Sequence, residues 1–580
     1  MRKGSGSGAL PASLFIVALI FASTVGFLTP RLTNAAIDDG LRTLEDAPFP
    51  FIAQTSVPVR EYQVTGEIAR KPYQFRRITL LPAGCLASVA IDGRPAAGPP
   101  TNRAASQGYE LALPEGPPIR IHAKIRSDSE MFGLSVAPPA GDPLVLALRL
   151  MAGAALAGGL YFSLRRWFSR AVSLILLGAL PVQLVYLSHT PATERAYDVL
   201  GHLQYIEFVT YHVSLPPSAF CFECYQPGLY YVLAAPVYAL ARAAGIFDPF
   251  VALQYFALAW FWVFLIVAAR IARLWLPRRR DELLAAALLA FWPGGFLESV
   301  RVSNDLPLYA CFAICLYFLL RWWNTGTGRD LSIAASVAAC GILIKAAMAV
   351  AMGAIGILAL YRMFSQRGES QPWRPYLGPI SVMAAGVVAY GVLNLVKAGE
   401  QAHNWRALYL GEAWKGLAPS MYVGNSWKQY LTLDGSYFRV PFVDSVATGT
   451  GKEYFWNYVL KSSMFGDYHW FRKPVERVLA FVMSPLLLGM AALFGAGVVR
   501  SLRASARQSL PLLVVTCLLF LALFLHRFLT PYSANNDFRF IYPALIPMVL
   551  LFVEGTRGLA AGRGLALAFC ALSAAFYLSV

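Results

Sequence analysis

The sequence contains few charged residues. Asp, Glu, Lys and Arg make up 14% of its 580 residues, whereas apolar residues make up 57% and the mean hydropathy is +0.52. Soluble globular chains contain about 25% charged residues. The composition therefore excludes an ordinary soluble globular protein and predicts an integral membrane protein.

Acidic residues are scarcer still: 32 Asp and Glu stand against 49 Lys and Arg, which gives a formal net charge of +17. A strongly basic balance is one sign of a nucleic-acid partner. Here, however, most Lys and Arg lie in short loops between apolar runs, where basic residues set the orientation of a membrane protein. We therefore expect no nucleic-acid partner.

Cysteine is also rare, with 8 residues in the whole chain. The five inside apolar runs are expected to pack as small apolar side chains: Cys311, Cys315, Cys340, Cys517 and Cys570. Cys221 and Cys224 form a C-x-x-C outside the predicted spans, in an oxidising compartment. A disulfide between them would close a tight ring, a metal site would need two further ligands, and unpaired packed cysteines are an equally good interpretation.

Long apolar runs are abundant, and a membrane span needs roughly 20 apolar residues. A basic start, MRKGSGSG, precedes the run ALPASLFIVALIFASTVGFL, which we interpret as a signal anchor and first span. Further runs lie near 143–164, 171–188, 250–273, 282–298, 306–323, 330–344, 346–363, 377–396, 476–499, 508–526, 538–556 and 564–580. The predicted fold is a polytopic α-helical membrane protein of about 13 spans.

Residues 31–142 contain no long apolar run. Short pieces such as YQVTGEI, RRITLLP and IRIHAKI are rich in β-forming residues and are bounded by turn residues. They predict a small extracytoplasmic β-sandwich between the first and second spans, with AIDGRP as a tight turn.

One apolar run, 229–245, decides the topology. It is short, with Pro236 in its middle and Arg242 near its end, as expected of a helix lying in the membrane interface. If it does not span, every later basic loop falls on the cytoplasmic side, in agreement with the positive-inside rule. The chain then divides into 1–30 (signal anchor and first span), 31–142 (β-rich domain), 143–396 (membrane core, with the first outer loop at 189–249), 397–475 (large outer loop) and 476–580 (C-terminal spans).

The outer loops contain most of the chain's polar chemistry. YDVLGHLQYIEFVTYHV, residues 197–213, has no proline and predicts a short helix along the membrane. Asp198, His202 and Tyr205 are spaced to share one face of that helix. The alternative to a functional site is an interfacial helix with polar anchors.

Four motifs resemble those of the GT-C glycosyltransferases, the superfamily of the protein O-mannosyltransferases and lipid A aminoarabinose transferases. YDVLGHLQYI, followed by YQPGLYYVLAA, resembles their first outer loop. SVRVSNDLPLYA supplies a second acidic site, GILIKA a lysine turn and FRFIYPALIP a late Arg–Tyr pair, and the resemblance covers roughly residues 170–580. The chain departs from the pattern at Val199, where many relatives have Glu, and at Gly228, where they have a second proline.

The resemblance implies transfer of a sugar from a polyprenyl-phosphate carrier to a glycan, lipid or protein acceptor at the outer face of a bacterial cytoplasmic membrane, with inversion. The residues it implies are Asp198 as general base, Asp305 as a second acidic group, Lys345, Arg527 and Arg539 as phosphate ligands, and His202, Tyr205, Asn304 and Tyr542 as supporting groups. A divalent cation is a possible cofactor. The structural alternatives are a helix cap for Asp305 and Asp537, and membrane-interface anchoring for Lys345 and the two arginines.

Three other functions compete with a transferase. A flippase for a lipid-linked glycan predicts charges deep within the spans and inverted repeats, and neither is evident. A lipid-linked glycan polymerase or ligase predicts several arginines in a large outer loop, and 397–475 contains three: Arg406, Arg439 and Arg472. A surface protein that binds glycan through its β-domain alone does not need about 13 spans.

Overall fold

The computed structural model describes residues 61–82, 85–95, 109–113, 117–126, 134–137, 142–190, 198–243, 249–365, 373–399, 419–467 and 473–579. It also describes Ala192, two short strands before residue 45 and a few positions before residue 30. Two compact units are present, one formed by 1–166 with 237–252 and the other by 167–236 with 253–580. The predicted first span, 1–30, lies almost entirely outside the described residues.

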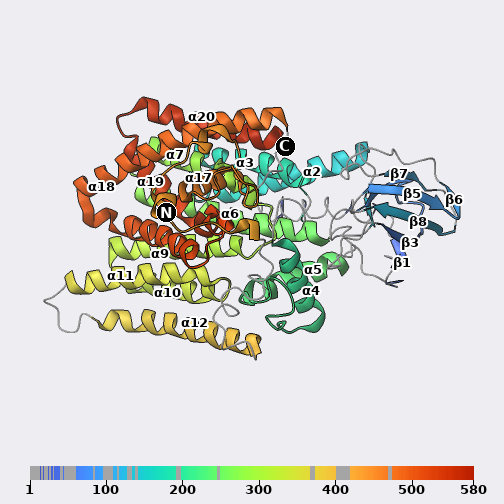
Figure 1. Ribbon diagram of the computed structural model, residues 1–580, viewed down its shortest axis with the longest axis horizontal. Helices are drawn as coiled ribbons and strands as arrows, with labels where there is room; N and C mark the ends of the chain where they lie inside the picture. Colours follow the sequence, from blue (N-terminus) through green and yellow to red (C-terminus); the bar gives the residue numbers. More distant parts are fainter. Residues whose placement is uncertain are drawn as a thin grey trace. The chain divides into compact units, whose positions relative to one another are not determined.

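The first unit contains the β-rich region, which confirms the prediction from the short β-forming segments (Figure 1). Its strands are β1 (Leu32–Asp38), β2 (Thr43–Leu44), β3 (Tyr62–Ile68), β4 (Arg77–Pro82), β5 (Cys85–Ile91), β6 (Arg94–Pro95), β7 (Tyr109–Ala112), β8 (Ile119–Arg126) and β9 (Leu134–Ala137). They form a six-stranded sheet, in the order β2-β1-β3-β8-β5-β6, and a three-stranded sheet, β7-β4-β9. All described pairings are antiparallel.

Alternating burial explains why these segments are strands. Along β3, Tyr62, Val64, Gly66 and Ile68 are buried while the residues that alternate with them are more exposed, and β8 repeats the pattern. The predicted tight turn joins β5 to β6, and Asp92 and Gly93 both have positive φ, at 48° and 78°. Positive φ at both central residues fits the right-handed twist of a two-residue hairpin.

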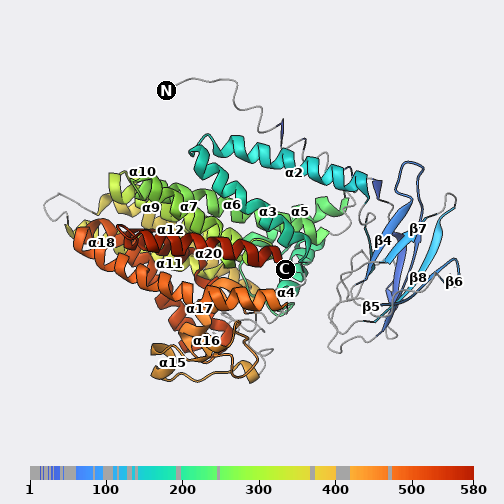
Figure 2. The same cartoon turned by 90° about the horizontal axis from the view of Figure 1, so that it is seen from above.

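Helices and the loops that connect them make up the rest of the described chain (Figures 1 and 2). The longer ones are α2 (Pro143–Leu164), α3 (Arg170–Ser188), α4 (Val199–His212), α5 (Leu229–Ala243), α6 (Pro249–Trp275), α7 (Arg279–Ala290), α9 (Asp305–Thr325), α10 (Gly328–Ile342), α11 (Ala349–Ser365), α12 (Arg374–Ala398), α17 (Phe455–Phe465), α18 (Pro474–Leu529), α19 (Leu545–Gly555) and α20 (Ala560–Ser579). The shorter ones are α8 (Pro293–Glu298), α15 (Trp427–Leu431), α16 (Ser436–Arg439), η1 (Ala346–Met348), η3 (Pro419–Met421), η4 (Ser533–Asn536) and η5 (Phe538–Ala544).

Ten helical segments within the described residues are long and apolar enough to cross a membrane, so the chain is a multi-pass membrane protein. Two predicted spans are shorter than expected. The run 282–298 divides into α7 and α8 at Trp292–Pro293, because a proline favours the first turn of a new helix over the interior of an old one. The run 330–344 is the 15-residue helix α10. The run 229–245 forms the short apolar helix α5, and its interfacial position stays a prediction.

Helices α18 and α19 approach each other at backbone distance. A Cβ atom at Gly497 of α18 would collide with the carbonyl oxygen of Leu551, and one at Gly555 would collide with the carbonyl oxygen of Leu493. Small residues allow this kind of close helix packing within membranes. The contact fixes α19, and α19 directly follows η5, the segment that carries Arg539.

We expect Gly497→Leu to force α18 and α19 apart and to destabilise the protein by about 1–3 kcal/mol, the usual cost of overpacking. Gly495→Leu is the matched control, because it lies on the same helix with no atom within 4 Å of its added Cβ. Thermal unfolding of both variants in detergent measures the difference, and equal midpoints would contradict the close packing.

Candidate functional site

Asp198, at the start of α4, and Arg539, in η5, form an ion pair. The Arg539 Nη2 donates to Asp198 Oδ2 at 2.9 Å, across 341 positions of sequence. Asp198 occupies the N-cap position of α4 but makes no capping hydrogen bond with its side chain. The carboxylate is 22% exposed and the guanidinium 13%, so the pair is largely buried with part of each side chain exposed.

Arg539 is positioned by the residues around it in η5. Asp537 caps this helix, as the sequence predicted, by accepting from the Arg539 backbone N–H at 3.0 Å. The Tyr309 hydroxyl of α9 donates to the Arg539 carbonyl oxygen at 2.6 Å. Tyr542, a predicted supporting residue, stacks on Tyr309 with ring centroids 5.0 Å apart. Tyr542 therefore supports the backbone that carries Arg539.

Lys345 and Asp305 form a second ion pair, with Lys345 Nζ 2.5 Å from Asp305 Oδ1. Lys345 lies in the turn between α10 and η1, and Asp305 in the first turn of α9. Asn304 occupies the N-cap of α9 and donates from Nδ2 to the Ile344 carbonyl oxygen at 3.2 Å, which holds the two segments together. Asp305 is thus an ion-pair partner rather than the N-cap residue.

The two ion pairs belong to one group, which we call the ionic cluster: Asp198, Asp305, Lys345 and Arg539. Both cations lie over the Phe540 ring, with Lys345 Nζ 5.6 Å and Arg539 Cζ 5.0 Å from its centroid. Burial alone would raise the pKa of Asp198, but Arg539 and the other nearby positive charges outweigh it and hold that pKa below its usual value. Asp198 is therefore a carboxylate at neutral pH.

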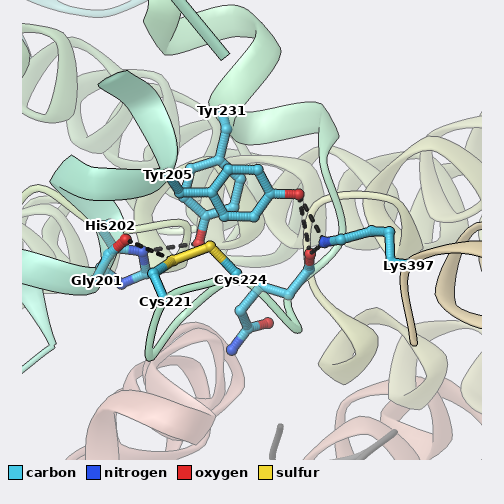
Figure 3. The surroundings of a disulfide bond; sticks show 8 residues. Gly201, His202, Tyr205, Cys221, Cys224, Tyr231 and Lys397 are labelled. Carbon is cyan, nitrogen blue, oxygen red and sulfur yellow. Dashed lines mark hydrogen bonds between the residues drawn. A yellow bond between two sulfur atoms is a disulfide. The ribbon is translucent and has the colours of Figure 1, made fainter. Parts of the chain in front are cut away.

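His202 lies one helical turn after Asp198, and its ring is buried. Its Nδ1 shares a hydrogen bond of 2.8 Å with the Tyr231 hydroxyl of α5, and the two rings stack (Figure 3). Burial lowers the pKa of His202 to about 4, although the Asp198 charge opposes this. The imidazole is therefore neutral at pH 7 and orients α4 against α5.

Tyr205 faces a different partner. Its hydroxyl accepts from Lys397 Nζ of α12 at 2.7 Å, and its ring stacks on Tyr231 with centroids 3.5 Å apart (Figure 3). Lys397 also donates to the Gln226 carbonyl oxygen at 2.5 Å. Lys397 was not identified from the sequence, because at the end of an apolar run it is typical of an interface anchor.

Arg527, the third predicted phosphate ligand, has different contacts from Lys345 and Arg539. It is fully buried, donates from Nη2 to the carbonyl oxygens of Gly424 (2.9 Å) and Glu453 (3.4 Å), and lies over the Tyr430 ring. All of these partners lie within residues 397–475, the segment between α12 and α18. The described contacts of Arg527 therefore hold that segment and do not include the ionic cluster.

Cys221 and Cys224 form a disulfide, which resolves the alternatives that the sequence left open (Figure 3). Between them lies Glu223, a carboxyl that the sequence analysis did not single out, although its side chain is only 4% exposed. The C-x-x-C spacing was the signal in the sequence that could have directed attention to Glu223. It did not show that the loop closed by the disulfide packs against α4.

The described residues contain no group of three or more His, Cys, Asp and Glu side chains placed to hold a metal ion. Asp198 and Asp305, the carboxylates of the ionic cluster, already have Arg539 and Lys345 as partners. These side chains therefore do not fit the divalent cation that the sequence left possible as a cofactor.

Residues 237–392 match the family of dolichyl-phosphate-mannose-protein mannosyltransferases. The matched region contains Asp305 and Lys345 but not Asp198 or Arg539. The match supports the resemblance to GT-C glycosyltransferases over the region that it covers, which includes the motifs SVRVSNDLPLYA and GILIKA.

Among solved structures, ArnT from Cupriavidus metallidurans bound to undecaprenyl phosphate resembles the chain with a TM-score of 0.43 and 15% identity. The similarity covers 68% of this chain and 62% of that one, so the chain spans less than two thirds of that protein. A search of curated proteins found no match.

We expect Lys345→Met to destabilise the protein by about 3–5 kcal/mol, because it leaves the buried Asp305 carboxylate without its partner. Adding Asp305→Asn removes that unpaired charge, so the double variant recovers most of the loss. Thermal unfolding of both single variants and the double variant gives the coupling energy. Strict additivity of the two changes would show that the pair does not act as a unit.

Proposed function

We propose that the protein transfers a sugar from a polyprenyl-phosphate donor to an acceptor hydroxyl at the outer face of the cytoplasmic membrane. The observation that carries the proposal is the ionic cluster, in which an accessible carboxylate lies beside two cations that come from distant parts of the chain. The family match over residues 237–392 supports a lipid-linked donor.

Asp198 is the general base in this proposal. The acceptor oxygen forms a bond to the anomeric carbon, the bond from that carbon to the donor phosphate oxygen breaks, and the acceptor proton passes to Asp198. A base must be unprotonated before the reaction and within reach of the acceptor. The lowered pKa and the 22% exposure of Asp198 fit both requirements. A single displacement of this kind inverts the anomeric configuration.

Arg539 and Lys345 stabilise the departing polyprenyl phosphate. Negative charge develops on that phosphate as the bond breaks, and fixed cations lower the energy of such a transition state. Arg539 presents a planar guanidinium that suits two phosphate oxygens, while Lys345 acts as a point charge. Asp305 holds Lys345 in position, and Asp537 and Tyr309 hold the backbone of Arg539.

The outer location of the site is argued from the distribution of basic residues. Taking α5 as interfacial leaves the loops RIARLWLPRRR, RSLRASAR and TRGLAAGRG on the cytoplasmic side, as the positive-inside rule requires. Asp198, Lys345 and Arg539 then share the opposite side, where the lipid-linked donor would be presented.

We expect Asp198→Asn to lower transfer by about 10²–10⁴-fold, the usual contribution of a general base. The assay supplies radiolabelled polyprenyl-phosphate sugars to vesicles that contain the full chain and native membrane acceptors. Glu110→Gln, at an exposed carboxyl of β7, is the control and retains the wild-type rate.

Two results would contradict the proposal in different ways. Equal rates for wild type and Asp198→Asn would leave the transfer reaction standing and remove Asp198 from the role of base. Absence of labelled acceptor with wild-type protein, for every donor supplied, would reject lipid-linked sugar transfer itself.

A further inference from the structure

The Cys221–Cys224 disulfide closes a ring of four residues just after α4. The ring is itself a tight turn, because the Cys224 backbone N–H donates to the Cys221 carbonyl oxygen at 3.1 Å. Both cysteines are buried, at 7% and 0% exposure, and so is Glu223 between them. A carboxyl side chain is therefore held in a covalently closed loop away from water.

The ring lies directly against the first turn of α4. The Sγ of Cys221 lies 3.5 Å from the Gly201 carbonyl oxygen, a packing contact because a bonded sulfur has no hydrogen to donate (Figure 3). A Cβ atom at Gly201 would lie 2.8 Å from Cγ and 2.9 Å from the backbone nitrogen of Glu223. Only glycine allows this approach. Gly201 belongs to the same helical turn as Asp198, whose carbonyl oxygen accepts from His202 at 3.2 Å.

Glu223 lies within the electrostatic reach of the ionic cluster. Burial first and then repulsion from Asp198 raise its pKa to about 8, although Lys345, Arg539 and a hydrogen bond from Gln226 oppose the rise. On the α5 side its neighbour is Tyr231. At neutral pH Glu223 is therefore mostly an uncharged acid, so the charges of the cluster stay balanced as two carboxylates and two cations.

We propose that Glu223, held by the Cys221–Cys224 ring against Gly201, is a positioning residue for Asp198. The ring fixes the helical turn that aims the Asp198 carboxylate. An uncharged Glu223 leaves Arg539 paired with Asp198, whereas an ionised Glu223 competes for Arg539 and Lys345 and disturbs both ion pairs. The inference rests on the proposed function, since it assigns Glu223 to the same site.

The test compares Glu223→Gln and Glu223→Ala with wild type in the vesicle transfer assay from pH 6 to pH 9.5. We expect wild-type kcat to fall as the pH rises through about 8, the pKa of Glu223. Glu223→Ala lowers kcat about tenfold at pH 7, and Glu223→Gln, an uncharged residue of similar shape, restores most of that loss and removes the alkaline fall. A merely structural role would lower the amount of folded protein without changing the pH profile.

The disulfide is tested with Cys221→Ser/Cys224→Ser, which we expect to lower kcat about as much as Glu223→Ala. Cys340→Ser is the matched control, because Cys340 is a free and exposed cysteine far along the chain. A double serine variant with wild-type kcat and pH profile, or Glu223→Ala with both unchanged, would overturn the inference.

Stability gives a readout that does not depend on the proposed reaction. The pKa of Glu223 in the fold, about 8, is above its ordinary value of 4.5, so its contribution to stability is full below pH 4.5 and is lost as the pH rises through 8. The wild-type unfolding midpoint should therefore fall relative to Glu223→Gln between pH 5 and pH 9. If wild type transfers no sugar, the proposed function fails, and a constant difference between the two midpoints would separately refute a neutral Glu223.

Discussion

The ion pair between Asp198 and Arg539 is the interaction on which the arrangement of the site depends. It joins the start of α4 to η5. These two segments lie far apart in sequence, and the folding of the helical core between them brings them together. Charged groups at the edge of a membrane are stable when they are paired or solvated. Asp198 and Arg539 are paired with each other and are partly exposed.

Much of this arrangement could be predicted from the sequence. Apolar runs marked nearly all of the long helices, because twenty apolar residues in succession have few alternatives to a span. Asp198, Asp305, Lys345 and Arg539 were identified from short motifs at predicted span ends, and the structure brings these four together. The β-forming residues of YQVTGEI and IRIHAKI, bounded by turn residues, predicted β3 and β8 before any pairing was known.

What the sequence could not show depends on contacts between distant residues. Tyr205 was predicted to support Asp198 because helical spacing puts both on one face, but Lys397 lies 192 positions away and takes its hydroxyl. The resemblance grouped Arg527 with the phosphate ligands, and the sequence did not show that its guanidinium donates to the carbonyl oxygens of Gly424 and Glu453. Glu223 gave no signal, since a glutamate inside C-x-x-C has no fixed meaning until its ring packs on Gly201.

The tight contact of Gly497 and Gly555 also limits how far Arg539 can move. Helix α19 cannot slide along α18 without a collision of main-chain atoms, so η5, which directly precedes α19, is held in place together with Arg539.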